Sequence, residues 1–140
     1  MNICKKVSVG ICVRFRDIDS MGHVNNAVFF SYFEEGRKAF LYKIFNITNP
    51  EDYNFILVHI SCDFLKPVKI NDLITLQLWV CETGKKSFTL RYKLTDSRDE
   101  SVVYAKGKSV QVFYDYRKKI SIPISNEFLE KISEYTGQEY

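Results

Sequence analysis

The segment RFRDIDSMGHVNN, residues 14–26, gathers side chains that could carry out chemistry. Its polar and turn-forming members are Asp17, Asp19, Gly22, His23, Asn25 and Asn26. Both aspartates should be ionised at neutral pH unless they are strongly buried. An ionised carboxylate could attack a carbonyl carbon directly or activate a water molecule as a general base.

This segment lies where a strand is expected to run into a helix. The first turn of a helix has unpaired N–H groups and the positive end of the helix dipole, so a carbonyl oxygen placed there would be polarised. A carboxylate a few residues earlier could lie on the other side of that carbonyl. The same residues also fit a structural role, in which the aspartates order the loop, Gly22 turns it, and Asn25 or Asn26 caps the helix. Spacing alone favours neither interpretation.

A thioester would be a suitable substrate for a site with so few candidate catalytic side chains. Its thiol leaving group has a pKa of about 8.5, like that of cysteine, and departs with little help from a proton donor. The chain has no Gly-x-Ser-x-Gly motif and contains two histidines, His23 and His59, so the nucleophile elbow of a serine hydrolase is not indicated.

Hydrophobic periodicity places the elements around this segment. Residues 6–16 alternate as a half-buried strand, with Val7, Val9, Ile11, Val13 and Phe15 on one side. Residues 25–45 have helical spacing, with Phe29, Phe33, Phe40 and Ile44 on one stripe. Gly36 weakens such a helix, so we expect a neighbouring backbone to approach it closely.

The second half of the chain has a period of two. Strands are predicted over residues 55–65, 73–82, 87–96 and 101–115, and a short helix capped by Ser125 over residues 125–135. One long helix and a long antiparallel meander predict an α+β domain whose sheet wraps around the helix. With 140 residues, of which 46% are hydrophobic, we expect residues 1–140 to form a single domain.

Composition narrows the class of protein. A net charge of +3 is compatible with an anionic small ligand but is too weak to suggest nucleic acid. No apolar run is long enough for a membrane span and the start does not resemble a signal peptide, so we expect a cytoplasmic protein without a membrane partner. Cys4, Cys12, Cys62 and Cys81 match no zinc or redox spacing, and we expect reduced thiols.

The stretch RFRDIDSMGHVNNAVFFSYFEEGR resembles the motifs D-x-D-x-x-G-H-V-N-N-x-x-Y and Y-F-E-E-A-R of hotdog-fold acyl-CoA thioesterases of the 4-hydroxybenzoyl-CoA thioesterase family. The similarity continues through HISCDFLKPVKINDLITL and GKKSFTLRYKL and covers nearly the whole chain except the C-terminal helix.

The resemblance implies one hotdog domain, with a long central helix wrapped by a curved antiparallel five-stranded sheet, plus a short C-terminal helix. It implies a homo-oligomer, either a dimer or a dimer of dimers, with active sites at the subunit interface. By this resemblance Asp19 is the catalytic carboxylate, acting as nucleophile or general base. The helix N–H at or beside Asn26 polarises the thioester carbonyl, and Asp17 is structural.

The chain departs from the family pattern at three places. Phe29 replaces the motif tyrosine, so a hydroxyl role is absent, and Gly36 replaces an alanine. Another branch has a Tyr-His pair where this chain has Asn25 and Asn26, so histidine assistance at that position does not apply. We interpret His23, on the substrate side of the loop, as ordering the loop rather than transferring protons.

Basic residues should flank a site that binds the phosphates of CoA. In the resembled family they lie where this chain has Lys85, Lys86 and Ser87, which we therefore predict to bind the nucleotide end. Lys66 and the tract at residues 117–119 are interpreted as solvated. We expect neither a metal nor another cofactor.

Three other functions remain open. The first is hydrolysis of an acyl group carried by an acyl-carrier protein, and the second is non-catalytic binding of acyl-CoA by the same fold. The third is dehydration, in which a histidine such as His23 would work with Asp19. Fold alone does not separate these activities, but the surrounding motif favours acyl-CoA hydrolysis.

Overall fold

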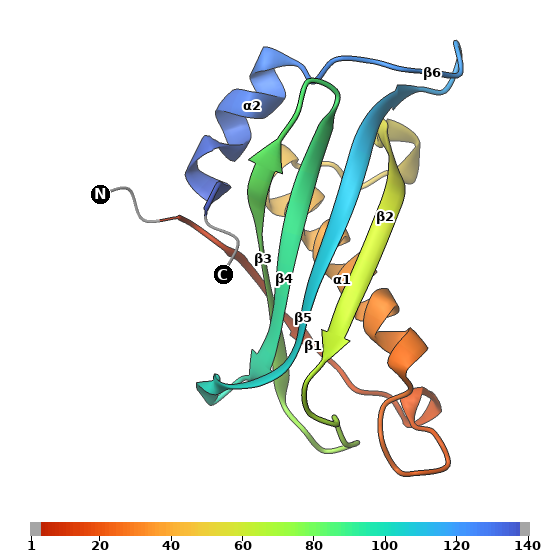
Figure 1. Ribbon diagram of the computed structural model, residues 1–140, viewed down its shortest axis with the longest axis vertical. Coiled ribbons are helices and arrows are strands. Elements are labelled where there is room, and N and C mark those ends of the chain that lie inside the picture. Colours follow the sequence, from red (N-terminus) through yellow and green to blue (C-terminus); the bar gives the residue numbers. More distant parts are fainter. Residues whose placement is uncertain (1–3, 138–140) are drawn as a thin grey trace.

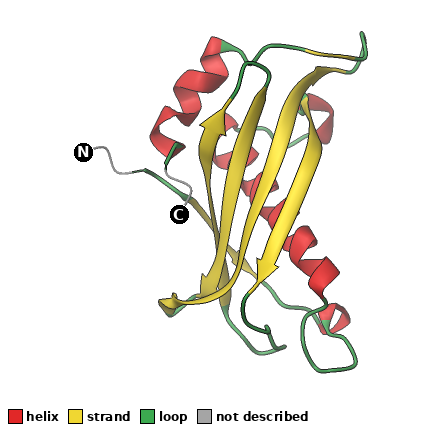
Figure 2. Ribbon diagram, in the orientation of Figure 1, coloured by secondary structure: helices red, strands yellow, loops and turns green. Residues whose placement is uncertain are grey.

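The computed structural model describes residues 4–137, in which a strongly curved antiparallel sheet wraps around one long helix (Figure 1, and by element type in Figure 2). The strands are β1 (Val7–Ile11), β2 (Phe55–Phe64), β3 (Ile74–Thr83), β4 (Ser87–Asp96), β5 (Asp99–Asp115) and β6 (Ile120–Ser121). The helices are α1 (Asn26–Phe45) and α2 (Asn126–Ile132), with 3-10 turns at Phe15–Asp17, Pro50–Asp52 and Ser133–Tyr135.

The strands lie in the order β1-β3-β4-β5-β2, and neighbouring strands are antiparallel. The five strands expected from the sequence are confirmed. The two-residue strand β6 was not expected, because two residues are too few to show alternation. It pairs with the end of β5 at Tyr114 and Asp115.

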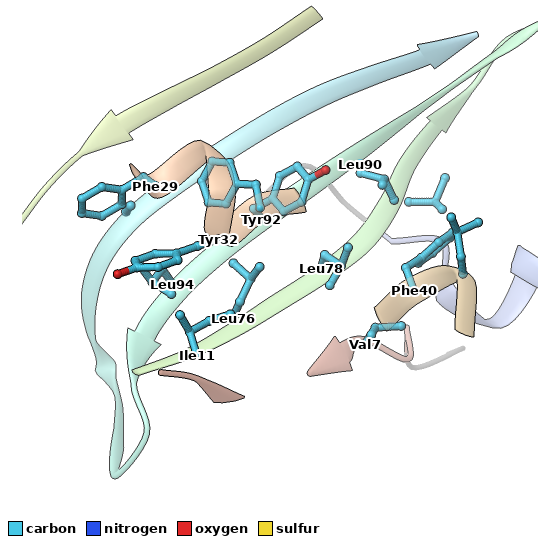
Figure 3. Close-up of a cluster of buried hydrophobic side chains, with 14 of the residues drawn as sticks. Val7, Ile11, Phe29, Tyr32, Phe40, Leu76, Leu78, Leu90, Tyr92 and Leu94 are labelled. Carbon is cyan, nitrogen blue, oxygen red and sulfur yellow. The ribbon is translucent and has the colours of Figure 1, made fainter. Parts of the chain in front are cut away.

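The core lies between α1 and the concave face of the sheet. The apolar stripe of α1 buries the side chains of Phe29, Tyr32, Phe33, Phe40 and Leu41. They meet leucines of β3 and β4, as Figure 3 shows for Leu76, Leu78, Leu90 and Leu94. Burying each of these large side chains contributes roughly 1.5–3 kcal/mol to folding, so packing fixes the position of α1 on the sheet.

Gly36 allows the close approach expected of it, but its neighbours are side chains rather than backbone. A Cβ atom at Gly36 would lie 2.5 Å from Cδ2 of Leu76 and 3.4 Å from Cδ2 of Leu78, both on β3. The prediction of a close backbone neighbour was therefore wrong. Leucine side chains standing up from the sheet occupy the space that a helix side chain would take.

The first strand is shorter than its alternation predicts. Pairing of β1 with β3 ends at Ile11, opposite Ile74. The chain then turns, and the backbone N–H of Arg14 donates to the Asp17 carboxylate instead of to a neighbouring strand. As a result Phe15, which alternation assigns to the buried side of the strand, is 88% exposed.

The C-terminal helix α2 closes one end of the core. Ser125 accepts a hydrogen bond from the backbone N–H of Phe128 at 3.2 Å, which confirms the predicted cap. The ring of Phe128 stacks on Phe45 at the end of α1, with the ring centroids 4.8 Å apart. This contact ties α2 to the end of α1 that lies farthest from the chemical segment.

Candidate active site

Asp19 lies in a tight loop that joins the 3-10 turn to α1. The loop is closed by a bridge between Ile18 and Val24, and Gly22 has a φ of 80°, which glycine adopts without strain. The Asp19 Oδ1 atom accepts hydrogen bonds from the backbone N–H groups of Met21 at 2.9 Å and His23 at 3.2 Å. These bonds fix the carboxylate from one side. Within residues 4–137, the other oxygen, Oδ2, accepts no hydrogen bond, so it is available to interact with a ligand.

Asp17 has hydrogen-bond partners different from those of Asp19. It is buried, and its Oδ2 atom accepts hydrogen bonds from the Arg14 N–H at 2.9 Å and from the Tyr32 hydroxyl at 2.8 Å. Its carbonyl oxygen accepts the N–H of Asn25. Burial, and then this hydrogen bond, raise the pKa of the Tyr32 hydroxyl above its usual value, so Tyr32 stays a donor. Asp17 thus fastens the loop to α1.

The start of α1 resolves which asparagine caps the helix. Asn25 is the cap: its side-chain oxygen accepts the backbone N–H of Ala27 at 2.9 Å, and its carbonyl oxygen accepts the N–H of Val28. Asn26 is the first helical residue. Among the hydrogen bonds of the described residues, its N–H has no acceptor, so it is available at the positive end of the helix dipole.

A pocket of about 230 Å³ brings these groups together. Its polar lining residues include Asp19, His23 and Asn26. The rest of its lining comes from the loop and α1, and from the end of β2 and the residues that follow it: Val24, Phe29, Phe64, Leu65, Lys66 and Pro67. A carbonyl group in this pocket could have the Asp19 carboxylate on one side and the N-terminus of α1 on the other.

The contribution of the segment after β2 was missed by the sequence analysis. The backbone N–H of Val24 donates to the carbonyl of Val68 at 2.8 Å, which brings this segment against the loop of Asp19. Phe64 then meets Phe29 edge to face, with ring centroids 5.2 Å apart. Lys66, interpreted as solvated, is exposed but also lines the pocket. The apolar run before Pro67 indicates that this segment packs against something, but it does not show that the loop of Asp19 is what it packs against.

Lys85, Lys86 and Ser87 are not brought to this pocket within one chain. Figure 1 shows the turn between β3 and β4 at one end of the sheet and the loop before α1 at the other. Val112 on β5 pairs with both Ser87 and Ile56, whereas Phe64 at the pocket lies eight residues farther along β2. At about 3.3 Å per residue, the separation along the strand is roughly 26 Å.

Three further findings concern the rest of the described chain. Residues 4–137 contain no group of three or more His, Cys, Asp and Glu side chains that could hold a metal ion. In the same residues, no helix combines the length and the apolar character needed to cross a bilayer. All four cysteines are unpaired, in agreement with the expected thiols.

Comparison with known proteins identifies the family. The family model described as the thioesterase-like superfamily matches residues 13–132. The chain belongs to the thioesterase-like superfamily. Like other members of this superfamily, it is a thioester hydrolase.

Solved structures and a curated relative agree with this assignment. A protein from Bacillus stearothermophilus, described as a predicted thioesterase, shares the hotdog fold, with a TM-score of 0.88 and 21% identity over 97% of this chain and 100% of its own. A thioesterase from Thermus thermophilus, solved with coenzyme A and Zn, is 30% identical over 90% of each chain, with a TM-score of 0.78. The long-chain acyl-CoA thioesterase FadM of Escherichia coli strain K12 is 26% identical, covering 89% of this chain and 95% of FadM.

Proposed function

We propose that the chain hydrolyses an acyl-CoA thioester to the free acid and CoA, with Asp19 as the reacting carboxylate. The observation that carries this proposal is a pocket lined by both Asp19, whose Oδ2 atom accepts no hydrogen bond among the described residues, and Asn26, whose N–H has no acceptor there. The coenzyme A complex of the Thermus thermophilus relative and the activity in the name of FadM support CoA as the carrier.

Two chemical routes to hydrolysis use the same Asp19 carboxylate. As a general base, Asp19 removes a proton from water while the water oxygen attacks the carbonyl carbon. As a nucleophile, Asp19 attacks the carbonyl carbon itself, the thiolate leaves, and water then hydrolyses the mixed anhydride. In both routes negative charge develops on the carbonyl oxygen, and the helix N-terminus with the Asn26 N–H stabilises it. CoA departs as a thiolate, which takes up a proton from solvent.

The routes differ in the fate of oxygen. In a single turnover in H₂¹⁸O, the general-base route puts ¹⁸O into the released acid. The nucleophilic route, with water attacking the aspartyl carbon of the anhydride, instead leaves ¹⁸O in the Asp19 carboxylate. Mass spectrometry of the acid and of the peptide that contains Asp19 would distinguish them.

The proposal is tested by thiol release from a panel of acyl-CoA esters. We expect Asp19→Asn to lower the turnover number at least a hundredfold, the lower end of what a positioned acid–base group contributes. Asp115→Asn is a matched control, because the Asp115 carboxylate also accepts two backbone N–H groups on one oxygen but does not line the pocket. Wild-type turnover by Asp19→Asn would refute the assignment.

The separation of Lys85 and Lys86 from the pocket supports a dimer as the active form. In the sheet of the described residues β2 is a terminal strand that pairs with β5 alone, and it carries exposed apolar side chains at Leu57, Val58 and Phe64. Such an edge is a template for pairing with another chain. Two-fold antiparallel pairing of β2 with a second copy would bring that copy's Lys85–Ser87 turn toward the Asp19 end, where it could bind the phosphates of CoA.

A further inference from the structure

We propose that Phe33, seated on Gly107, limits this chain to compact acyl groups by filling the space between α1 and the sheet behind the Asp19 pocket. This inference rests on the proposed hydrolysis of acyl thioesters and specifies the acyl group that the site accepts. It concerns the space into which an acyl chain would extend once its carbonyl lies between Asp19 and the start of α1.

The volume of the pocket limits the size of the acyl group that fits in it. Its volume is about 230 Å³, and a cavity of about 150 Å³ is large enough for a benzene ring. Phe29, which is 2% exposed, and Phe64 are the aromatic residues of its apolar lining. A ring or a short aliphatic chain therefore fits without displacing the core, whereas a long chain needs a continuation of the pocket.

Within one chain, the space between α1 and the sheet is filled by Phe33 one helical turn beyond Phe29. On the concave face, the row after Phe64 and Ala105 consists of Cys62, Gly107 and Tyr92, about 6.6 Å farther along the strands. Phe33 lies on this row. A Cβ atom at Gly107 would be 2.6 Å from Cζ of Phe33, so the ring rests directly on the glycine backbone.

The ring of Phe33 is also held by Tyr92, which pairs with Gly107 on the neighbouring strand. It stacks on Tyr92 with the ring centroids 4.4 Å apart and an angle of 15° between the ring planes, and Phe33 is fully buried. Moving the ring would cost the stacking contact and the burial at once. An acyl chain that extended from the pocket between α1 and the sheet would therefore meet a buried aromatic plug.

Behind this plug, the space between α1 and the sheet holds buried polar side chains. The Tyr92 hydroxyl lies 2.6 Å from the Ser109 Oγ atom and accepts a hydrogen bond from Nη1 of Arg37 at 3.2 Å, while Ser109 donates to Gln111. Gln111 in turn donates to the carbonyl oxygen of Phe88 at 3.1 Å. A hydrocarbon tail can replace none of these hydrogen bonds, and buried polar groups left without partners are costly. The ring of Phe33 and the hydrogen-bond network are thus two separate barriers to a long acyl chain in this space.

The chain-length profile of the wild-type protein tests the inference. Thiol release is measured for butyryl-, hexanoyl-, benzoyl-, dodecanoyl- and palmitoyl-CoA, each below its micellar concentration. We expect kcat/KM for hexanoyl- or benzoyl-CoA to exceed that for palmitoyl-CoA at least tenfold. Equal or faster hydrolysis of palmitoyl-CoA would overturn the size limit and leave the proposed function standing. Release from no ester would overturn both.

A variant pair tests the assignment of the limit to Phe33. Phe33→Leu shortens the plug while keeping an apolar side chain, and we expect the preferred acyl chain to lengthen and dodecanoyl-CoA to gain at least fivefold in kcat/KM relative to hexanoyl-CoA. Phe40→Leu is the control, because Phe40 is buried on the same face of α1 but packs on Phe88, farther from the pocket.

Binding of S-alkyl-CoA thioethers, measured by calorimetry, gives a readout that does not depend on turnover. We expect Phe33→Leu to tighten binding of the dodecyl thioether relative to the hexyl thioether, and Phe40→Leu to leave that ratio unchanged. An unchanged ratio and an unchanged chain-length profile in folded Phe33→Leu would overturn the role of Phe33.

Discussion

Asp17 and Asp19 are the same residue type two positions apart, yet hydrogen bonding gives them different tasks. Asp17 is buried and accepts hydrogen bonds from Arg14 and Tyr32. Asp19 accepts loop backbone N–H groups through one oxygen, accepts no hydrogen bond on the other among the described residues, and lines the pocket. The catalytic role of Asp19 stays a proposal, but the geometry distinguishes a carboxylate committed to the fold from one that has room for a substrate.

The raised pKa of Tyr32 predicts how the stability of the fold depends on pH. Burial and the bond to Asp17 raise its folded-state pKa, while an unfolded tyrosine loses its proton near pH 10. The associated stability is therefore fully present below about pH 10 and is lost as the pH rises above that value. Tyr32→Phe should be less stable at pH 7 by about 1–3 kcal/mol, because Asp17 loses a donor, and should lose less additional stability above pH 10.

Urea unfolding at pH 7 to 11 checks this prediction. Tyr42→Phe is the control, because Tyr42 lies exposed on the same helix. If wild type and Tyr32→Phe lost stability in parallel above pH 10, Tyr32 would not be the group responsible.

His23 can be tested as a proton-transfer group. Its contacts with Asp19 are made by backbone atoms: its N–H donates to the Asp19 carboxylate and its carbonyl accepts the Asp19 N–H. Changing the side chain leaves both bonds available. We expect His23→Gln to keep its turnover number within about tenfold of wild type, whereas a proton-transfer role predicts a loss of roughly a hundredfold or more. Thiol release measured across pH 5 to 9 separates the two.

At the scale of elements, the position of α1 depends on where the sheet leaves room for it. Gly36 on the helix and Gly107 on β5 mark two such contacts, one against leucine side chains and one against the ring of Phe33. Because α1 carries the N-terminus that faces the pocket, these contacts also set the geometry of the site.

Two strand glycines provide a matched test of this close packing. Gly107→Ala would place a methyl group against the Phe33 ring and 3.1 Å from the carbonyl oxygen of Ser61, whereas a Cβ at Gly10 on β1 would meet no atom within 4 Å. We expect Gly107→Ala to lower the free energy of unfolding by about 1–3 kcal/mol, as overpacking does. Gly10→Ala should be neutral or stabilising by up to about 1 kcal/mol.

Urea denaturation of both variants measures the difference. Equal stability of the two would show that the ring of Phe33 moves away at little cost, and would also weaken its proposed role as a plug.

At the scale of the whole molecule, opposite ends of the sheet hold the pocket and the lysine-bearing turn, which the proposed function requires together. The pocket lies at the Phe64 end of β2, and the turn with Lys85 and Lys86 lies at the other end of the sheet. Pairing of two copies through β2 would bring the two ends together, and would also cover the apolar side chains of that strand.

Val58→Lys tests this pairing. Val58 is 53% exposed near the middle of β2, where two-fold antiparallel pairing sets a residue close to its own copy, so two lysines would repel each other. We expect sedimentation to show a dimer, or a dimer of dimers, for wild type and monomers for Val58→Lys, with CoA binding weakened in the variant. Leu73→Lys, at an exposed position just before β3 and remote from β2, should keep the wild-type assembly. An unchanged assembly of Val58→Lys would argue against pairing through β2.

The sequence by itself determined most of the elements and the segment that holds the candidate site. Helical spacing located α1 to within a residue, alternation located β2 to β5, and Ser125 marked the start of α2. The motif around Asp19 indicated thioester chemistry. These features are readable because periodicity, caps and turn residues act over a few neighbouring positions.

Only the tertiary structure decided which segments meet. It turned Phe15 outward, set leucine side chains rather than backbone against Gly36, and joined Phe64 to the loop of Asp19. It also separated Lys85 from the pocket by most of the length of a strand. Contacts of this kind join positions tens of residues apart and follow from sheet curvature and side-chain packing, which leave no local pattern in the sequence.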